Sequence, residues 1–423
     1  MKLNFVFESD LENFTKCTDV SPSGIRRFAA SPMSLACLAR KEIAIQAGVG
    51  NRPKNYIIAT GVNHSPKEWV GSSSAQTNLN ASPFKFLNKK LFKDIQSGNA
   101  MVLFDQSLEG YQTTWLWEYF HIECDRYKIN PQAIVYTSGN MLGHSQYNDW
   151  ATANNKMDRI TVIPYAHFES DMYNLGIRTN INLTVDKHLA YKKDHNIKSY
   201  NCLQKRLRNH RIWFYVKLLE ANLLNDGLVS MNKFSKARHY MEGRVMSSNQ
   251  ESTANTTLPS LVYGKNNNEQ GDHFYINRIN NDVCLDTWLS VISEASFADI
   301  NGQLFLSEKV FKPIVCHHPF IIMGDRGSLR ELRKMGYKTF DGFVDERYDK
   351  LSTWERYDAI IEELKRIIAI KDKASWFESM RPILEHNYKT LTHNSKEVNP
   401  AFIALGRAYK KYFKLGKYKI RLT

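Results

Sequence analysis

Short apolar runs that alternate with longer helical patterns constrain the fold of this chain more than any other feature of its sequence. In the first half, these runs are rich in β-branched or aromatic residues and are followed by turn-forming residues. They cover residues 3–7, 56–60, 101–104, 133–136 and 160–163. Helical patterns at residues 84–96 and 115–127 lie between them. Strands separated by helices predict a parallel sheet with crossover helices.

The second half repeats this alternation. A helical pattern over residues 203–224 stops at Asn225-Asp226-Gly227, and Ser352 with Glu355 forms a capping box before another helix. Residues 250–272 are polar and predict a long loop. Further strands are expected at residues 228–230, 288–292, 319–323 and 338–343.

The two halves predict an α/β protein with two domains of similar size, which fits a length of 423 residues. We expect an N-terminal α/β domain over residues 1–190, a C-terminal α/β domain over 191–395 and a basic helix or tail over 396–423. Two Rossmann-like domains of this kind are expected to face a cleft, which is a preferred place for a ligand.

The net charge of +14 is concentrated in two segments. Residues 187–217 hold nine Lys or Arg against the single acid Asp194, and residues 407–423 hold seven against none. The remainder of the chain is nearly neutral. The second segment interleaves its cations with Tyr and Phe, a composition suited to nucleic acid. A solvated C-terminal helix explains that segment equally well.

Cysteine usage and hydropathy exclude several classes of protein. The six cysteines form no CxxC pair, so free thiols in a reducing compartment are expected. The pair His317-His318 lacks a partner at metal-ligand spacing and is expected to pack or cap. No run approaches the roughly 18 apolar residues of a membrane span, and the N-terminal apolar run is too short for a signal peptide. A cytoplasmic protein without a transmembrane segment is expected.

The familiar signatures of nucleotide and hydrolytic sites do not occur in the sequence. No GxGxxG follows a strand, and GxxxxGK[ST], HExxH and GxSxG are all absent. There is also no Asp-x-Asp, the spacing by which many sugar transferases hold a divalent metal. Any nucleotide chemistry is therefore expected to rely on protein cations and helix dipoles instead of a metal.

The most informative stretch combines acids, a cation and a helix start. Ser293-Glu294 ends a predicted strand, and Ser307-Glu308-Lys309 begins a helix after the following loop. The amides of such a helix start, together with the Lys309 ammonium, can hold a diphosphate. Glu308 can accept hydrogen bonds from ribose or sugar hydroxyls. The alternative is that Ser307 and Glu308 only cap the helix.

These residues resemble a known donor-binding signature. With the strand at Pro319-Phe320-Ile321-Ile322-Met323-Gly324, Ser293-Glu294 and Ser307-Glu308-Lys309 are similar to the signature of the fucosyltransferase and exostosin-like glycosyltransferases of the GT-B fold. The match covers residues 200–345. Phe311-Lys312-Pro313 and residues 336–341 also look like uncharacterised glycosyltransferase-like proteins of bacteriophages.

A second match opens the C-terminal domain at Asn201, Arg211, Tyr215 and Leu218. The resemblance implies that an arginine here reaches the donor phosphate, and Arg206 and Arg208 are rivals of Arg211 for this role. The donor-binding residues that we expect are Asn201, Arg206, Arg211, Glu294, Ser307, Glu308 and Lys309.

The resemblance implies a metal-independent GT-B glycosyltransferase that moves a hexosyl- or fucosyl-type sugar from a nucleotide-diphosphate donor to an acceptor hydroxyl, with inversion. No further cofactor is expected, and the acceptor is a hydroxyl of modified DNA or of a surface glycan. The alternative is a basic nucleic-acid-binding protein in which the transferase-like domain is catalytically silent.

An inverting transferase needs one carboxylate that deprotonates the acceptor hydroxyl. Asp105 and Glu109 follow a predicted strand of the first domain, where its carboxyl end is expected to face the cleft. We favour Glu109 over Asp105, and Glu8, just past the first strand, is the next candidate. The alternative is that each of these acids only closes a turn or caps a helix.

Overall fold

The computed structural model divides into two compact units by the contacts within the chain. Unit 1 comprises Met1–His167, Asn301–Gln303 and Glu397–Thr423, and unit 2 comprises Phe168–Ile300 and Leu304–Lys396. The structure describes residues 3–7, 44–48, 53–61, 84, 87, 89–107, 110, 114–178, 180–204, 207–231, 240–241, 244–257, 281–297, 302–396 and 400–414.

The first division between the units falls after His167, ahead of the boundary that the sequence predicts after residue 190. Helices α6 (His167–Arg178) and α7 (Val185–Lys193) therefore contribute to unit 2. The reason is local packing, because Glu169 of α6 accepts hydrogen bonds from Tyr337 (2.6 Å) and Asn394 (2.7 Å). The described part of the expected basic helix or tail over 396–423 is a helix that belongs to unit 1.

Unit 1 contains a six-stranded sheet in the order β2-β1-β3-β4-β5-β6, and each pair of neighbours is parallel. Every residue of the central strand β4 is buried, as expected for a parallel strand covered on both faces. Strand β2 was not predicted from the sequence. The strands are β1 (Leu3–Phe7), β2 (Ala44–Gly48), β3 (Tyr56–Gly61), β4 (Ala100–Gln106), β5 (Ile134–Ser138) and β6 (Thr161–Pro164).

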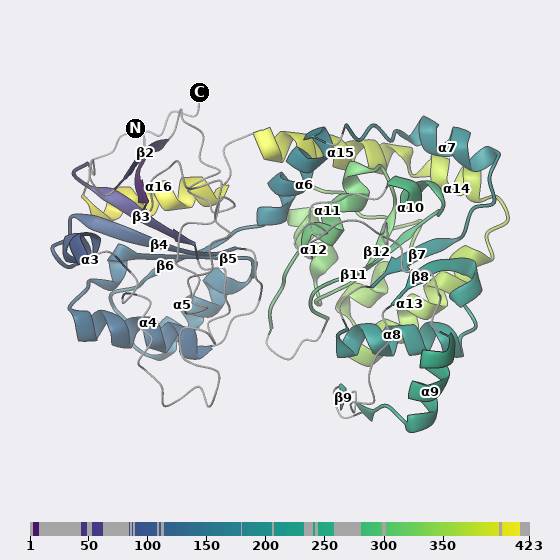
Figure 1. Ribbon diagram of the computed structural model, residues 1–423, viewed down its shortest axis with the longest axis horizontal. Coiled ribbons are helices and arrows are strands. Elements are labelled where there is room, and N and C mark those ends of the chain that lie inside the picture. Colours follow the sequence, from purple (N-terminus) through teal and green to yellow (C-terminus); the bar gives the residue numbers. More distant parts are fainter. Residues whose placement is uncertain are drawn as a thin grey trace, which may run out of the picture. The chain divides into compact units, whose positions relative to one another are not determined.

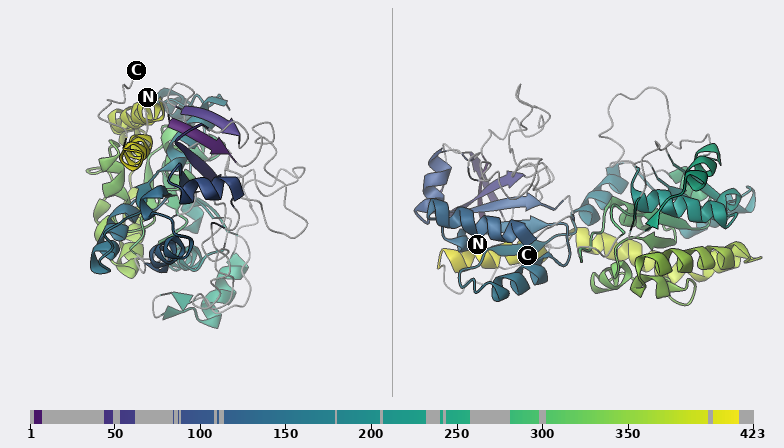
Figure 2. Two further views of the ribbon diagram at one scale, coloured as in Figure 1. Left: turned by 90° about the vertical axis from the view of Figure 1, so that its left-hand side faces the viewer. Right: turned by 90° about the horizontal axis from the view of Figure 1, so that it is seen from below.

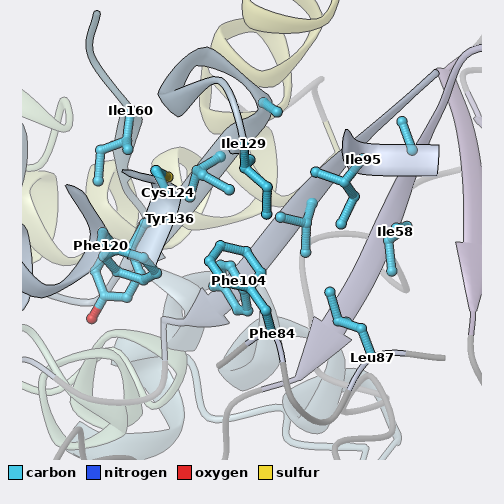
Figure 3. Close-up of a cluster of buried hydrophobic side chains, with 14 of the residues drawn as sticks. Ile58, Phe84, Leu87, Ile95, Phe104, Phe120, Cys124, Ile129, Tyr136 and Ile160 are labelled. Carbon is cyan, nitrogen blue, oxygen red and sulfur yellow. The ribbon is translucent and has the colours of Figure 1, made fainter. Parts of the chain in front are cut away.

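One face of this sheet packs against α3 (Lys89–Gln96), α4 (Thr114–Tyr127) and α5 (Gly143–Ala153). Aromatic side chains dominate the cluster, and Phe104 contacts Phe84 and Phe120 with ring centroids 5.8 and 5.4 Å apart. Figure 3 shows Phe84, Phe104, Phe120 and Tyr136 gathered in this cluster with aliphatic neighbours such as Ile58 and Ile95. The abundance of aromatic residues in this half of the sequence thus serves the core.

The other face of the same sheet packs against α16 (Pro400–Tyr412), the last described helix of the chain. Phe402, Leu405 and Tyr409 of α16 are buried with strand residues that alternate with those of the first face. Figures 1 and 2 show this yellow helix beside the purple and blue strands from the beginning of the chain. The C-terminal segment therefore completes the core of unit 1.

Unit 2 contains a four-stranded sheet in the order β12-β11-β7-β8, again with parallel neighbours. A two-stranded antiparallel ribbon, β9 (Tyr240–Met241) with β10 (Arg244–Val245), is separate from it. The strands of the main sheet are β7 (Tyr200–Leu203), β8 (Gly227–Ser230), β11 (Ser290–Ser293) and β12 (Phe320–Met323). The predicted α/β class with two parallel sheets is therefore confirmed.

Helices cover both faces of the unit 2 sheet. Figure 1 shows α8 and α13 on one side of its strands, and α7, α10, α11, α14 and α15 on the other. The Ser352–Glu355 capping box is present at the start of α13, as predicted. The helices are α8 (Asn209–Glu220), α9 (Ser248–Thr257), α10 (Asn281–Leu285), α11 (Glu308–Val315), α12 (Ser328–Lys334), α13 (Thr353–Ile368), α14 (Lys373–Ser379) and α15 (Arg381–Lys396).

Three local predictions were wrong. Residues 338–343 form no strand, because Asn387 and Glu346 accept hydrogen bonds from the amides of Lys338 and Phe340 and so replace a neighbouring strand. Of the loop expected over residues 250–272, residues 250–257 belong to α9 (Ser248–Thr257), and residues 258–272 lie outside the described residues. The helix expected over residues 203–224 starts only at α8, because the preceding residues 200–203 form β7.

Candidate functional site

The carboxyl ends of β7, β11 and β12 bring charged residues to one edge of the unit 2 sheet. Parallel strands end at a common edge, where α/β proteins commonly bind ligands. Arg208 and α8 follow β7, Glu294 follows β11, and Asp325 follows β12. Hydrogen bonds also tie the start of α11 to this edge.

Glu294 is a fully buried carboxylate that holds the start of α11. Its Oε1 accepts a hydrogen bond from the amide of Ser307 (2.9 Å), and its Oε2 accepts from the Ser307 hydroxyl (2.6 Å) and the Ala295 amide (2.9 Å). Burial raises the pKa of Glu294, and the nearby Lys309 ammonium opposes that rise. Both oxygens thus accept hydrogen bonds from the protein itself, and the donor contact of Glu294 expected from the sequence stays a prediction.

The start of α11 has the capping arrangement that the sequence offered as the alternative. Ser307 is the N-cap, and its hydroxyl accepts from the Lys309 amide (3.3 Å). The Lys309 ammonium donates to the Ser307 hydroxyl (3.1 Å) and to Glu308 Oε1 (2.6 Å). Burial by itself would raise the pKa of Glu308, but the ammonium groups of Lys309 and Lys312 outweigh burial and lower it. The Lys309 side chain remains 29% exposed and so stays accessible to a ligand.

Two arginines approach the loop after β11 from the start of α8. The Arg211 guanidinium donates to the carbonyls of Ser293 (3.1 Å) and Glu294 (2.8 Å). Burial, together with the neighbouring Arg208 cation, lowers the pKa of Arg211 to about 10. Arg208 is exposed, and its guanidinium donates to the Ala295 carbonyl. Arg211 and Arg208 therefore lie together, whereas Arg206 lies outside the described residues.

His210 lies beside these arginines and stays neutral. Its Nε2 donates to the Glu294 carbonyl (3.1 Å). Burial lowers the pKa of His210 to about 3, and the Arg211 cation adds to the effect. A neutral imidazole leaves the positive charge at this edge to the arginine and lysine side chains. Sequence reasoning did not identify His210, although it directly precedes Arg211.

Asp325 and Arg356 belong to the same edge and were also not predicted. Asp325 Oδ2 accepts from the Phe305 amide (3.1 Å), and burial raises the pKa of Asp325 to about 7. The Arg356 guanidinium donates to the carbonyls of Gly324 (2.7 Å) and Phe297 (3.0 Å). The position of Asp325 directly after a strand was a usable signal, but nothing local in the sequence distinguishes Arg356 from other helical arginines.

Two buried polar side-chain atoms lie at this edge. Gln204 follows β7 and Ser293 ends β11, and both residues are 2% exposed. Within the described ranges, Gln204 Oε1 and Ser293 Oγ have no hydrogen-bond partner. Buried polar atoms are nearly always paired in native proteins, so Gln204 Oε1 and Ser293 Oγ are exceptions at this edge.

Asn201 does not join this group. Its side-chain amide donates to Thr287 Oγ1 (2.8 Å) and Ser290 Oγ (2.9 Å). Ser290 opens β11 and pairs with Asn201, so these contacts lie toward the amino end of the strands. Asn201 therefore ties two strands together at a distance from Arg211 and Lys309.

The candidate bases of unit 1 are only partly described. Asp105 is the next-to-last residue of β4, and its Oδ1 accepts from the Ser107 amide (3.0 Å). This is the turn-closing contact that the sequence offered as the alternative. The favoured base Glu109 and the third candidate Glu8 lie outside the described residues.

The described residues offer no cluster of three or more His, Cys, Asp or Glu side chains that can hold a metal ion. His318 is buried and contacts Ser290 Oγ (2.9 Å) and the Thr287 carbonyl (2.8 Å), and His317 stacks on Tyr388 with ring centroids 4.5 Å apart. The prediction that this pair packs is confirmed. Among the helices in the described ranges, none is long and apolar enough to cross a membrane.

Comparison with solved structures gives matches that span nearly the whole chain at low similarity. The α,α-trehalose-6-phosphate synthase from Burkholderia multivorans matches at 8% identity and a TM-score of 0.45, over 98% of this chain and 99% of that chain. Sucrose-phosphate synthase from Thermosynechococcus elongatus matches at 13% identity and 0.42, over 98% and 100%. Phytolacca americana UGT2 matches at 7% identity and 0.33, over 97% and 99%.

No protein-family model matches the sequence, and no curated protein sequence matches it significantly. At these identities and TM-scores, the structural matches carry no argument about activity. The α/β class with two parallel sheets rests on the strand order and pairing of this chain, and its function has to be argued from the residues at the edge of the unit 2 sheet.

Proposed function

We propose that the chain is a GT-B glycosyltransferase that transfers a sugar from a nucleotide-diphosphate donor to an acceptor hydroxyl. The cationic start of α8 carries this proposal. Arg208 and Arg211 meet there, and Arg208, the N-cap residue, makes no side-chain capping hydrogen bond. A helix start without a side-chain cap presents amide N–H groups and the positive end of the helix dipole to an anion. This combination suits a diphosphate.

The two helix starts at this edge differ in what they can offer a phosphate. In α11, the Ser307 hydroxyl already accepts from an amide of the first turn and contacts Glu294. In α8, the N-cap residue Arg208 makes no side-chain hydrogen bond of this kind. We therefore assign the helix amides of the phosphate site to α8, and α11 contributes the partly exposed Lys309 ammonium and the Glu308 carboxylate. Glu294 and Ser307 act as positioning residues for both.

The proposed chemistry uses these cations to stabilise the leaving group. As the bond between the anomeric carbon and the diphosphate oxygen breaks, negative charge develops on the nucleoside diphosphate. Arg208, Arg211 and Lys309 stabilise that charge without a metal ion, which is electrostatic stabilisation of the transition state. The acceptor oxygen forms the new bond to the anomeric carbon, with inversion for a hexosyl- or fucosyl-type donor.

A carboxylate takes the proton of the acceptor hydroxyl in this scheme. Glu109 remains the favoured base and Asp105 the second candidate. Asp105 already accepts a hydrogen bond from Ser107 at the end of β4, which supports a turn-closing role for it and leaves Glu109 as the first residue to test. A hydroxyl of modified DNA or of a surface glycan is the proposed acceptor.

Turnover of nucleotide sugars tests the proposal. A panel of uridine, guanosine, adenosine and cytidine diphosphate sugars is incubated with the protein in the presence of EDTA, and release of the nucleoside diphosphate is measured. We expect one donor to be hydrolysed or transferred, and a loss of about 100-fold for Lys309→Ala, of the size seen for removal of one transition-state contact. The exposed Lys365→Ala serves as control.

Two results would contradict the proposal. One is the absence of turnover and binding for every donor in the panel, which favours the catalytically silent alternative. The other is full activity of Lys309→Ala. A requirement for added divalent metal would overturn only the metal-independent part of the mechanism.

A further inference from the structure

The exposed side of α16 carries cations without acidic partners. Arg407 and Lys411 are exposed and lie one helical turn apart, and Lys414 is exposed in the turn that follows. Lys54 is exposed beside Asn55, whose carbonyl accepts a hydrogen bond from Tyr409 of α16 (2.7 Å). Within the described part of the chain, none of these four cations forms an ion pair. We call these four residues the α16 surface.

The opposite side of α16 fixes this surface on the core of unit 1. Phe402, Leu405 and Tyr409 are 6% exposed or less and pack against the sheet. The cations thus project from a helix that cannot rotate without exposing its apolar side. No acid occurs in the sequence from Pro400 onward, so the positive charge of the helix is not neutralised from its own segment.

We propose that the α16 surface binds the phosphate backbone of single-stranded nucleic acid. Cations in a row bind a phosphodiester chain with release of its counterions. Tyr412 and Phe413 lie between Lys411 and Lys414, pack partly against the core of unit 1, and contact each other with ring centroids 4.9 Å apart. The parts of these rings that stay exposed lie among the cations, where unpaired bases can stack, so a single strand is the occupant that we propose.

An anionic membrane fits this surface less well. Helices that bind a bilayer bury an apolar face in it, but the apolar face of α16 is used in the core of unit 1. The exposed large hydrophobic residues within the described ranges are Ile122, Met157, Ile177, Leu207 and Val245, and none lies on α16. Only charge would hold the surface at a membrane.

The α16 surface and the proposed donor site belong to different units. The α16 surface lies in unit 1, where Asn4 and Asn55, at the amino ends of β1 and β3, both contact Tyr409. Arg211 and Lys309 belong to unit 2. Nucleic-acid binding is therefore expected to be independent of the donor-site residues, so this inference and the proposed function can fail separately.

Fluorescence anisotropy with a labelled oligo-dT tests the inference on the full chain. The variant Arg407→Gln/Lys411→Gln/Lys414→Asn removes three charges. Asn is used at 414 because Lys414 has a φ of 51°, which Asn tolerates. The control Lys350→Gln/Lys365→Gln/Lys371→Gln removes three exposed charges from unit 2. Circular dichroism of both variants checks that the fold is retained.

We expect the native chain and the control to bind the oligonucleotide with affinity that falls steeply with salt. The triple α16 variant should bind about tenfold or more weakly, with a log–log salt slope shallower by about 2, since each phosphate contact on a single strand contributes about 0.7. The variant Arg208→Ala should bind the oligonucleotide as the native chain does.

Three outcomes would overturn the inference. If the α16 variant and the control lose oligonucleotide affinity equally, the loss depends on net charge and not on the α16 surface. If the α16 variant binds as the native chain does, but binding is lost when the chain is cut after Lys414, then residues 415–423 bind the oligonucleotide instead. Binding to vesicles with anionic lipid, but not to oligonucleotide, would identify a membrane surface instead.

Discussion

Among the described residues, the carboxyl edges of the two parallel sheets differ in charge. In unit 2, Glu294, Lys309 and Arg211 lie close to one another and bind loop backbone and helix starts. In unit 1, the described buried residues at the ends of β4 and β5 include the neutral Ser107, Ser138 and Asn140 beside the acid Asp105, and Glu109 lies outside the described residues. The same architecture therefore supports two different kinds of edge.

The two edges also differ in how their polar groups are paired. A neutral polar edge needs only hydrogen bonds between neighbours, such as that from the Asn140 amide to the Ser138 hydroxyl (3.0 Å). At the edge of the unit 2 sheet, the Lys309 ammonium pairs with Glu308, whereas the Arg208 and Arg211 guanidinium groups donate to backbone carbonyl oxygens. Glu294 accepts hydrogen bonds from the Ser307 hydroxyl and from the amides of Ser307 and Ala295.

The largest expected effect concerns the buried acid of unit 2. Burial raises the pKa of Asp325 from its ordinary value of 3.8 to about 7. Between these two values the folded state holds one proton more than the unfolded state, so stability falls as pH rises through this window. The variant Asp325→Asn lacks this titration and should gain up to about 4 kcal/mol relative to the native chain between pH 4 and pH 7.5.

Hydrogen exchange of β11 and β12 at several pH values measures this difference, because it reports the opening free energy of unit 2 alone. The unit 1 strands β4 and β5 are the internal reference. Parallel pH curves for Asp325→Asn and the native chain would show that Asp325 does not titrate in this window.

The second effect concerns Glu294. Truncation in Glu294→Ala leaves the Ser307 amide, the Ser307 hydroxyl and the Ala295 amide without their acceptor. We expect a loss of about 3 kcal/mol in the free energy of opening of unit 2. The control Glu362→Ala removes an exposed partner of Arg347 and should change stability by less than about 1 kcal/mol. Equal losses for both variants would show that Glu294 does not hold the start of α11.

A smaller difference in stability is expected between variants of one serine at each edge. Ser307 contacts both Glu294 and the first turn of α11, whereas the Ser138 hydroxyl accepts from the Asn140 amide. We expect Ser307→Ala to cost unit 2 about 2 kcal/mol and Ser138→Ala to cost unit 1 about 1 kcal/mol. Peptide-level hydrogen exchange measures the opening free energies of unit 1 and unit 2 separately. A larger loss for Ser138→Ala would contradict the contrast between a charged and a neutral edge.

Sequence patterns predicted the parts of the fold that depend on local burial. The apolar runs located five of the six strands of unit 1, since buried parallel strands are continuous apolar segments. The pattern failed at β2, AIQAG, which is short and weakly apolar. It also failed at residues 338–343, where side chains distant in sequence satisfy the backbone.

Sequence patterns located part of the candidate site but not the contacts within it. The positions after strands identified Glu294 and the Ser307-Glu308-Lys309 helix start, and the structure brings them together with Arg211. The sequence patterns could not show that the Glu294 carboxylate accepts hydrogen bonds from Ser307, because the two residues lie thirteen positions apart. Arg356 approaches the edge from α13 with no local signal, and Asn201 matched a pattern although its contacts lie elsewhere.

Isothermal titration of nucleoside diphosphates into the native chain, Arg208→Ala and Lys365→Ala tests the central claim most directly. Arg208 is exposed, so its removal is expected to leave the fold intact. We predict that one nucleoside diphosphate binds the native chain and the Lys365→Ala control equally, that the matching nucleoside binds at least tenfold more weakly, and that Arg208→Ala loses about tenfold in affinity for the diphosphate. Unchanged diphosphate affinity in both Arg208→Ala and Lys309→Ala would contradict a phosphate site at the start of α8.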